Sequence, residues 1–276
     1  MAIKGTLAVC REIKEIARGG QKVVYSAFHP MHGPVVLKLG EYPHPGALER
    51  ISREVDLLAK INSPYFPHHY GFIVEDRTRE FLIIEERVDG LPLSECMGRF
   101  SSEAEIIALI SLLVEALNIL WEQRVVHRDI KPQNIIIRTN GRPVVIDLGI
   151  ARLLDLSSLT LACSPFGPCT AIYASPEQLQ NLKPIIDVRA DFFALGLLAL
   201  QLHLGFHPFA PEKVGIGDSI PDNIINGRYV HPGQEHNISE AFGQLIQKLL
   251  ATEPYERFRN RNSLAMYLAS NWEGLA

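Results

Sequence analysis

One short stretch of the chain concentrates polar side chains in an apolar setting. Residues 127–134 read His-Arg-Asp-Ile-Lys-Pro-Gln-Asn, between Val125-Val126 and Ile135-Ile136-Ile137. Two β-branched runs around a polar loop predict a strand, a tight loop and a second strand. Asp129 and Lys131 alternate and could point the same way, and Asn134 could reach the same ligand. A carboxylate such as that of Asp129 can accept a proton from a hydroxyl, or orient that hydroxyl.

Residues in other parts of the chain could complete a phosphate and metal site. Gly19-Gly20 lies between two expected strands, where free backbone N–H groups suit a phosphate. Lys38 follows the apolar run Val35-Val36-Leu37, and a buried lysine needs an anion. Glu54 on the following helix or a phosphate could serve as that anion. Asp147, at the end of an apolar strand, and Asn134 are oxygen ligands suited to Mg²⁺.

The elements that must position these residues fall into two parts. The first part has short β-prone runs and one helix, 46–61, whose leucines, isoleucine and valine recur at helical spacing. The expected strands are 13–16, 22–28, 34–39, 70–75 and 80–86. Beyond a linker at 88–92 the chain becomes mostly helical, with expected helices at 103–123, 187–204, 238–251 and 262–271 and a strand at 143–146. We therefore expect a small β-rich lobe, a larger helical lobe and a ligand site in the cleft between them.

Composition narrows the class of protein. The chain has 276 residues, 47% of them hydrophobic and 21% charged, as in an ordinary globular protein. A net charge of -4 argues against a nucleic-acid binder. The cysteines have no paired spacing, which indicates reduced thiols in the cytoplasm. The N-terminus does not read as a signal peptide, and the apolar runs 106–121 and 192–206 fall short of the roughly 20 apolar residues of a membrane span. We expect no nucleic-acid partner, no membrane span and two buried core helices.

These residues, in this order, resemble the protein kinase family, specifically its Ser/Thr branch, from about Arg11 to Leu268. The resemblance implies an α+β bilobal fold in a single domain, with an antiparallel N-lobe over residues 1–88 and a mostly helical C-lobe over 89–276. It implies ATP with Mg²⁺, or alternatively Mn²⁺, and transfer of the γ-phosphate to a serine or threonine of a protein substrate.

The resemblance also implies a role for each polar residue. Asp129 is then the catalytic base, and Lys131 steadies the transferring phosphate. Asn134 and Asp147 hold the metal. Lys38 contacts the α- and β-phosphates and pairs with Glu54.

The nucleotide-binding part of the resemblance is imperfect. Ala17 and Lys22 replace two glycines of the family's phosphate loop, which implies a changed nucleotide affinity or rate. Leu148 stands where the family usually has phenylalanine. Glu85 occupies the position at the back of the adenine pocket, where an acidic residue is unusual, and the backbone of Glu86 and Val88 would bind adenine. The full expected ATP-binding set is Ala17, Arg18, Gly19, Gly20, Gln21, Lys22, Val24, Val36, Lys38, Glu54, Glu86, Val88 and Ile136.

Further matches lie in the expected C-lobe. Ser175-Pro176-Glu177 resembles the end of the activation segment, and Arg257 resembles the buried ion-pair partner of Glu177. Asp191 resembles the helix residue that braces the catalytic loop. Thr170 occupies the family's threonine position in the substrate-docking loop.

Regulation of the expected enzyme involves a separate hypothesis. In many kinases the residue at the position of Arg128 clamps a phosphorylated activation segment. We therefore hypothesise that Ser157, Ser158 or Thr160 is autophosphorylated and that this phosphate orders the segment.

Two other functions compete with a protein kinase. A pseudokinase would hold nucleotide without turnover; the altered phosphate loop favours it, whereas intact Lys38, Asp129, Asn134 and Asp147 oppose it. A small-molecule phosphotransferase of kinase-like fold lacks the Pro-Glu and Arg pair of the activation segment, so Glu177 with Arg257 weighs against it. Two local features have both a functional and a structural interpretation, and the structural one is favoured for each. His68-His69 could be a metal pair, but a surface turn is the favoured interpretation. Cys163 and Cys169 could form a redox switch, but ordinary thiols are the favoured interpretation.

Overall fold

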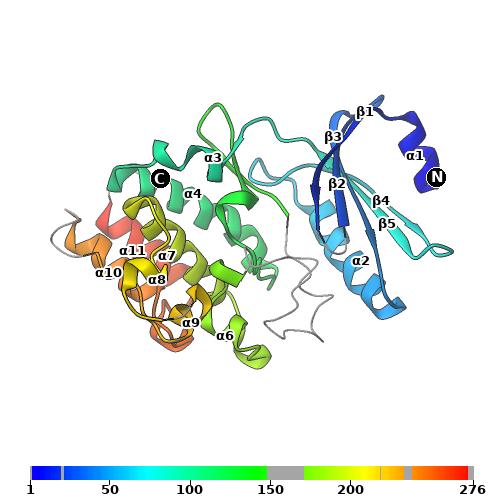
Figure 1. Ribbon diagram of the computed structural model, residues 1–276. Coiled ribbons are helices and arrows are strands. Elements are labelled where there is room, and N and C mark those ends of the chain that lie inside the picture. Colours follow the sequence, from blue (N-terminus) through cyan, green and yellow to red (C-terminus); the bar gives the residue numbers. More distant parts are fainter. Residues whose placement is uncertain (1, 20–21, 148–170, 218, 233–237, 273–276) are drawn as a thin grey trace. The chain divides into compact units, whose positions relative to one another are not determined.

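The structure is a computed structural model that describes residues 2–19, 22–147, 171–217, 219–232 and 238–272. The side chains of Arg50 and Glu54 also lie outside the description. The chain divides into two compact units, and the division falls between Asp89 and Gly90. Figure 1 shows the sheet in the first unit and the helices in the second.

The first unit is built on a five-stranded antiparallel sheet in the order β1-β2-β3-β5-β4. Its strands are β1 (Arg11–Arg18), β2 (Lys22–His29), β3 (Gly33–Glu41), β4 (His69–Glu75) and β5 (Glu80–Glu86). This sheet, followed by a larger helical part, confirms the expected fold class. The five predicted strands all exist: β1 and β3 extend three or four residues further than the sequence pattern indicates, β2 and β4 extend one residue further, and β5 has the predicted bounds.

Strand alternation gives the two faces of this sheet different partners. Leu82 and Ile84 on β5 pack in a cluster with Ile3 of helix α1 (Ile3–Val9). Phe81 and Ile83, which point the opposite way, pack with Ile51 and Val55 of helix α2 (Pro45–Lys60). Successive strand residues face opposite sides, so α1 covers one face and α2 the other.

The helix α2 has well-defined ends. The Nδ1 atom of His44 accepts a hydrogen bond from the N–H of Ala47, and Pro45 occupies the first helical turn, where its missing N–H is tolerated. The chain leaves the helix at Ile61, in the extended conformation. The backbone of Glu54 lies in this helix.

The second unit is mostly helical around the buried helices α4 (Glu103–Glu122) and α7 (Arg189–Leu204). Its other helices are α3 (Leu93–Cys96), α6 (Pro176–Leu179), α8 (Pro211–Val214), α9 (Ile220–Ile225), α10 (Glu240–Leu249) and α11 (Arg261–Asn271). A three-stranded sheet has the order β6-β7-β8, with β6 (Leu91–Pro92), β7 (Ile135–Ile137) and β8 (Pro143–Val145). Short 3-10 turns, including η2 (Pro132–Asn134) and η3 (Ala171–Tyr173), connect these elements.

The helix α4 begins with a capping box, in which Ser102 and Glu105 satisfy each other's backbone N–H groups. Among the described residues it is the one helix long and apolar enough to cross a membrane by length and composition. A little over half of its most apolar window is buried inside the protein, as in a core helix, and a single such helix is weak evidence for a span.

Several local predictions differ from the structure. Val125-Val126 is not a strand, because β7 pairs with β6 and β8 instead. The expected linker at 88–92 therefore contributes β6. The sequence also missed α1, whose seven residues are too few for a clear helical period. His69 is wrongly assigned to a surface turn, since it begins β4 opposite Glu85.

Candidate functional site

The loop at residues 127–134 is held from α7 by one buried carboxylate. Asp191 accepts hydrogen bonds from the backbone N–H groups of His127 (2.9 Å) and Arg128 (2.8 Å). Its Oδ2 atom also accepts from Nε1 of Trp121 at the end of α4 (2.9 Å). The predicted brace is therefore present. The sequence missed Trp121, because an indole on an apolar helix reads as core.

Three polar side chains meet on this loop. The Nζ atom of Lys131 lies 2.9 Å from Oδ2 of Asp129, and Nδ2 of Asn134 donates to the same oxygen at 2.8 Å. Nδ2 of Asn134 also donates to the backbone oxygen of Asp129 (2.8 Å). The turn η2 makes this possible, since the N–H of Asn134 bonds the oxygen of Lys131 and folds the chain back. The three side chains converge as expected.

Asp147 is brought beside Asn134 through the backbone. The N–H of Ile146 donates to the backbone oxygen of Asn134 at 2.9 Å, which ties the end of β8 to the loop. Asp147 itself has φ 62° and Arg128 has φ 66°. Non-glycine residues rarely adopt this left-handed region, and such strain gathers at functional sites. Both residues belong to the expected site.

A buried ion pair joins α6 to the segment before α11. Nη1 and Nη2 of Arg257 lie 2.7 Å and 2.9 Å from the two carboxylate oxygens of Glu177. Both side chains are fully enclosed. The pair expected from the sequence is thus present, in the bidentate geometry that makes such bonds strong.

The short helix α6 also contacts the loop that carries Asp129. Ser175 and Gln178 form a capping box at the start of α6. The Nε2 atom of Gln178 then donates to the backbone oxygen of Arg128 at 3.0 Å. The sequence did not indicate this contact, because Gln178 lies 50 positions from Arg128.

The turn η3, which directly follows Thr170, is anchored by His207. Nε2 of His207 donates to the backbone oxygen of Ile172 (3.0 Å), and Nδ1 accepts from the N–H of Phe209 (3.3 Å). Burial lowers the pKa of His207 to about 4, and the bond to Ile172 opposes this only in part. The neutral ring therefore suits both bonds, whereas a proton on Nδ1 would face another N–H.

We expect His207 to make the stability of the protein depend on pH. Its folded pKa of about 4 lies below the reference value of 6.5, so the unfolded state binds more protons between these values. The contribution is full above pH 6.5 and is lost as the pH falls towards 4, about 3 kcal/mol in all. Denaturant unfolding at several pH values should show that His207→Gln flattens this dependence.

The matched control is His231→Gln. His231 is exposed and packs on a tyrosine ring, with 4.2 Å between the centroids of His231 and Tyr229. The prediction would be contradicted if the free energy of unfolding depended on pH to the same extent in wild type and in His207→Gln.

In the first unit, Lys38 has an acidic neighbour that the sequence did not assign to it. Nζ of Lys38 lies 2.6 Å from Oε2 of Glu85 on β5. The predicted partner, Glu54, belongs to α2, but its side chain is outside the description. The Lys38–Glu54 pair therefore stays a prediction.

The other residues of the expected nucleotide set occupy both units. Ala17 and Arg18 end β1, and the N–H of Gly19 donates to the backbone oxygen of Lys22 at the start of β2. Val24 pairs with Lys38 across β2 and β3, and Val36 lies on the same face of β3. The N–H of Glu86 is bonded to the oxygen of His68 at 2.8 Å. Val88 follows β5, and Ile136 lies in β7 of the second unit.

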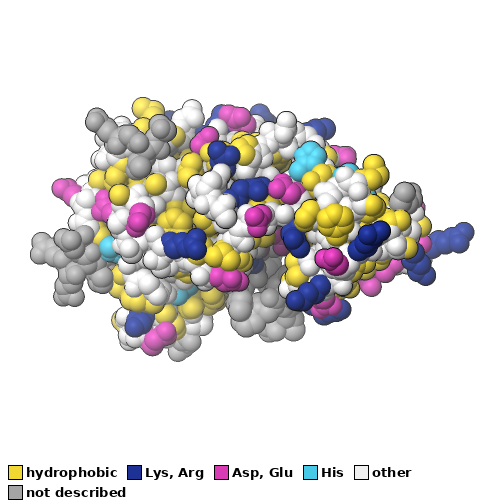
Figure 2. All heavy atoms as spheres, turned by 90° about the horizontal axis from the view of Figure 1, so that it is seen from above, with side chains coloured by type: hydrophobic (Ala, Val, Ile, Leu, Met, Phe, Trp, Pro, Cys, Tyr) yellow, Lys and Arg dark blue, Asp and Glu magenta, His cyan; other side chains and the backbone are white. Residues whose placement is uncertain are grey.

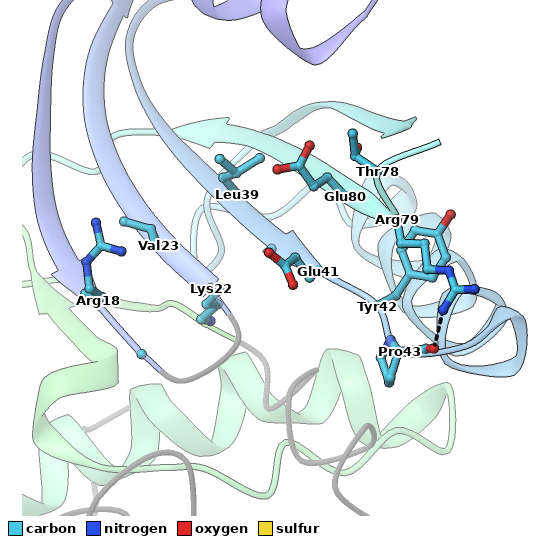
Figure 3. Close-up of a pocket in the computed structure, with 12 residues that line it drawn as sticks. Arg18, Lys22, Val23, Leu39, Glu41, Tyr42, Pro43, Thr78, Arg79 and Glu80 are labelled. Atoms are coloured by element: carbon cyan, nitrogen blue, oxygen red, sulfur yellow. Dashed lines mark hydrogen bonds between the residues drawn. The ribbon is translucent and has the colours of Figure 1, made fainter. Parts of the chain in front are cut away.

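A cavity of about 510 Å³ lies at one end of the first unit's sheet. Figure 3 shows Arg18 and Lys22 on one side of it and Glu41 and Glu80 on the other. Arg79 closes the far end by donating to the oxygen of Pro43 (3.2 Å). The cavity includes Arg18, Gly19 and Lys22 of the expected nucleotide set, but Lys38 is not part of its lining.

Several expected residues lie outside the described part of the chain. They are Gly20, Gln21, Leu148, Ser157, Ser158, Thr160 and Thr170. Within the described residues, no group of three or more His, Cys, Asp or Glu side chains could hold a metal ion. The expected metal pair is of another type, since Asn134 contributes an amide. On the face that Figure 2 displays, basic and acidic side chains are interspersed.

Comparison with known proteins gives a consistent result. The family profile described as "Protein kinase domain" matches residues 10–272. The chain is 31% identical over 229 residues to the probable serine/threonine-protein kinase PknB of Lactococcus lactis, covering 78% of this chain and 35% of that protein. It is 27% identical over 261 residues to PknH of Mycobacterium tuberculosis, with 91% of this chain and 40% of that protein covered.

Another relative covers more of the chain. Serine/threonine-protein kinase Pkn1 of Myxococcus xanthus is 29% identical over 278 residues, covering 95% of this chain and 38% of that protein. The chain thus spans well under half the length of the curated relatives named here.

Proposed function

Because the chain belongs to the protein kinase family, we propose that it transfers the γ-phosphate of ATP to serine or threonine hydroxyls of a protein substrate, with Mg²⁺ as cofactor. The names of the relatives support the serine/threonine class. The observation that carries the proposal is the cluster on the loop, where Lys131 and Asn134 both contact Oδ2 of Asp129.

The cluster fits a hydroxyl acceptor. Lys131 and Asn134 hold the carboxylate of Asp129 in one orientation, and Asp191 fixes the loop backbone beneath it. An oriented carboxylate can accept or align the proton of an incoming hydroxyl. Lys131, only 2.9 Å from Asp129, adds a positive charge where phosphate charge would need balance. Lys38 would bind the α- and β-phosphates.

The donor set fits Mg²⁺. Nδ2 of Asn134 makes both bonds to Asp129, so its Oδ1 atom is the group that can face a cation. Asp147 supplies a carboxylate, and it directly follows Ile146, whose N–H bonds the backbone oxygen of Asn134. Carboxylate and amide oxygens suit this hard ion, which keeps its remaining sites for water and phosphate. When bound, Mg²⁺ would neutralise and orient the phosphate oxygens.

The decisive experiment measures transfer of labelled γ-phosphate to the protein itself and to a generic basic protein. Asp129→Asn should lower transfer by about 10²–10⁴, the usual contribution of a positioned base, while fluorescent-nucleotide binding persists. Chelation of divalent ions should abolish transfer, and Mg²⁺ or Mn²⁺ should restore it. Equal transfer by wild type and Asp129→Asn would reject the proposal and favour the pseudokinase. Transfer to a small hydroxyl compound alone would favour the other phosphotransferase.

We also propose that the activation segment controls this activity through Ser157, Ser158 or Thr160, with Thr170 docking the acceptor. The contact between α6 and the backbone of Arg128 supports a link between the end of this segment and the catalytic loop. After incubation with Mg-ATP, peptide mass spectrometry should find phosphate within residues 155–170. No phosphate there, or full activity after all three are changed to alanine, would refute this regulation.

Location in the cytoplasm is a further part of the proposal. The described cysteines, Cys10 and Cys96, are free thiols, and burial raises the pKa of each. Raised thiol pKa values favour the inert protonated form. Cell fractionation of the native protein tests the location directly, and recovery in a membrane or extracellular fraction would contradict it.

A further inference from the structure

The ion pair between Lys38 and Glu85 is a consequence of strand register. In the antiparallel pairing of β3 and β5, Val36 lies opposite Glu85 and Lys38 lies opposite Ile83. Lys38 and Glu85 are therefore diagonal neighbours on one face, the face that carries Ile83 and α2. The sheet itself, not a chance side-chain conformation, brings the two charges together.

Both members of the pair are removed from water. Lys38 is 8% exposed and Glu85 is 6% exposed. A buried charge is strongly unfavourable unless a partner of opposite sign and further hydrogen bonds compensate it. The ammonium has three donors, so Lys38 can hold Glu85 and still offer N–H groups to other acceptors.

The other strand beside Glu85 supplies a neutral neighbour. His69 of β4 lies directly opposite Glu85, and its buried Nδ1 atom has no hydrogen-bond partner among the described residues. Burial is the main cause that lowers the pKa of His69, with Lys38 and His68 adding to it, whereas Glu85 and Asp56 oppose it. With His69 uncharged, the ion pair that Glu85 forms among the described residues is the one with Lys38.

We infer that Glu85 is a positioning residue of the nucleotide site, which holds the ammonium of Lys38 at a fixed point from the β5 side. The inference rests on the proposed function, because it takes Lys38 to be the group that binds phosphate. Glu85 also sets the charge that arriving phosphates meet, since its carboxylate offsets part of the ammonium charge.

Two substitutions separate position from charge. Glu85→Gln keeps an acceptor oxygen for Lys38 and removes a negative charge, so kcat should stay within about threefold of wild type and nucleotide binding should not weaken. Glu85→Leu removes the acceptor, so the ammonium of Lys38 is no longer held in one position. We expect kcat to fall about tenfold or more, which corresponds to the free energy of one hydrogen bond to a charged group. Glu75→Gln, at the far end of the neighbouring strand β4, is the matched control.

The experiment compares kcat, KM for ATP and fluorescent-nucleotide affinity for the four proteins, with thermal unfolding to establish folding. If Glu85 only stabilised the fold, kcat and nucleotide affinity would fall in proportion to the loss of stability. Glu85→Gln and Glu85→Leu would then not differ in kcat at equal stability. Equal kcat for Glu85→Leu and Glu85→Gln at equal stability would overturn the inference.

A second readout needs neither nucleotide nor turnover. Acetic anhydride labels neutral amines, and mass spectrometry can compare Lys38 with the exposed Lys60 in the same sample. Loss of the carboxylate disfavours the charged amine, so both Glu85 variants should label faster at Lys38. Unchanged labelling of Lys38 in Glu85→Gln would refute the ion pair, whether or not Glu85→Leu folds. Faster labelling with no transfer by wild type would instead leave the pair standing and reject the proposed function.

Discussion

Asparagine at position 191 is expected to lower phosphate transfer about a hundredfold without abolishing nucleotide binding. The carboxylate of Asp191 accepts three hydrogen bonds, from the N–H groups of His127 and Arg128 and from the indole of Trp121. Asparagine keeps one acceptor oxygen, and its NH₂ group would face an N–H donor. A displacement of about 1 Å in a catalytic group can reduce the rate by roughly 10².

The measurement for Asp191→Asn is kcat together with denaturant unfolding. We expect a loss of about 2–3 kcal/mol in the free energy of unfolding, because the lost bonds are buried and involve a charged acceptor. The matched control is Asp187→Asn just before α7, whose carboxylate is about half exposed and pairs with Arg189. Its kcat should be close to that of wild type. Equal effects of the two substitutions would show that Asp191 does not position the loop.

Methionine in place of Arg257 is expected to produce the largest loss of stability, about 3–5 kcal/mol. Besides Glu177, the guanidinium donates to the backbone oxygens of Ala251 (2.8 Å), Arg189 (2.8 Å) and Thr252 (3.0 Å). Its five N–H groups are therefore all used. Removal of the side chain leaves the carboxylate of Glu177 buried without this cation.

Denaturant unfolding of a double-mutant cycle tests this prediction. Glu177→Met combined with Arg257→Met should lose less than the sum of the single losses, because no charge stays buried without a partner. The double variant should still be less stable than wild type, since three backbone oxygens lose their donor. The control is Arg228→Met, whose pair with Asp222 has side chains 41% and 42% exposed. It should cost below about 1 kcal/mol, and a similar cost for Arg257→Met would contradict the prediction.

The sequence by itself determined the fold class, the five strands of the first sheet and the main helices. Strands with β-branched runs and helices with apolar periodicity carry a local signal, because burial of one face imposes the period. It also indicated which polar residues the loop at 127–134 would bring together. Asp129, Lys131 and Asn134 lie within six consecutive positions, so a single turn can bring them together.

Only the tertiary structure revealed the distant contacts that the sequence did not indicate. Trp121 and Asp191 are 70 positions apart, and Gln178 and Arg128 are 50 apart, so no local pattern could pair them. The pairing of Lys38 with Glu85 depends on how β3 and β5 align, and a one-residue slip would turn one of the two side chains to the other face. Residue types thus identify which groups can do chemistry, whereas strand register and helix packing decide which charges they face.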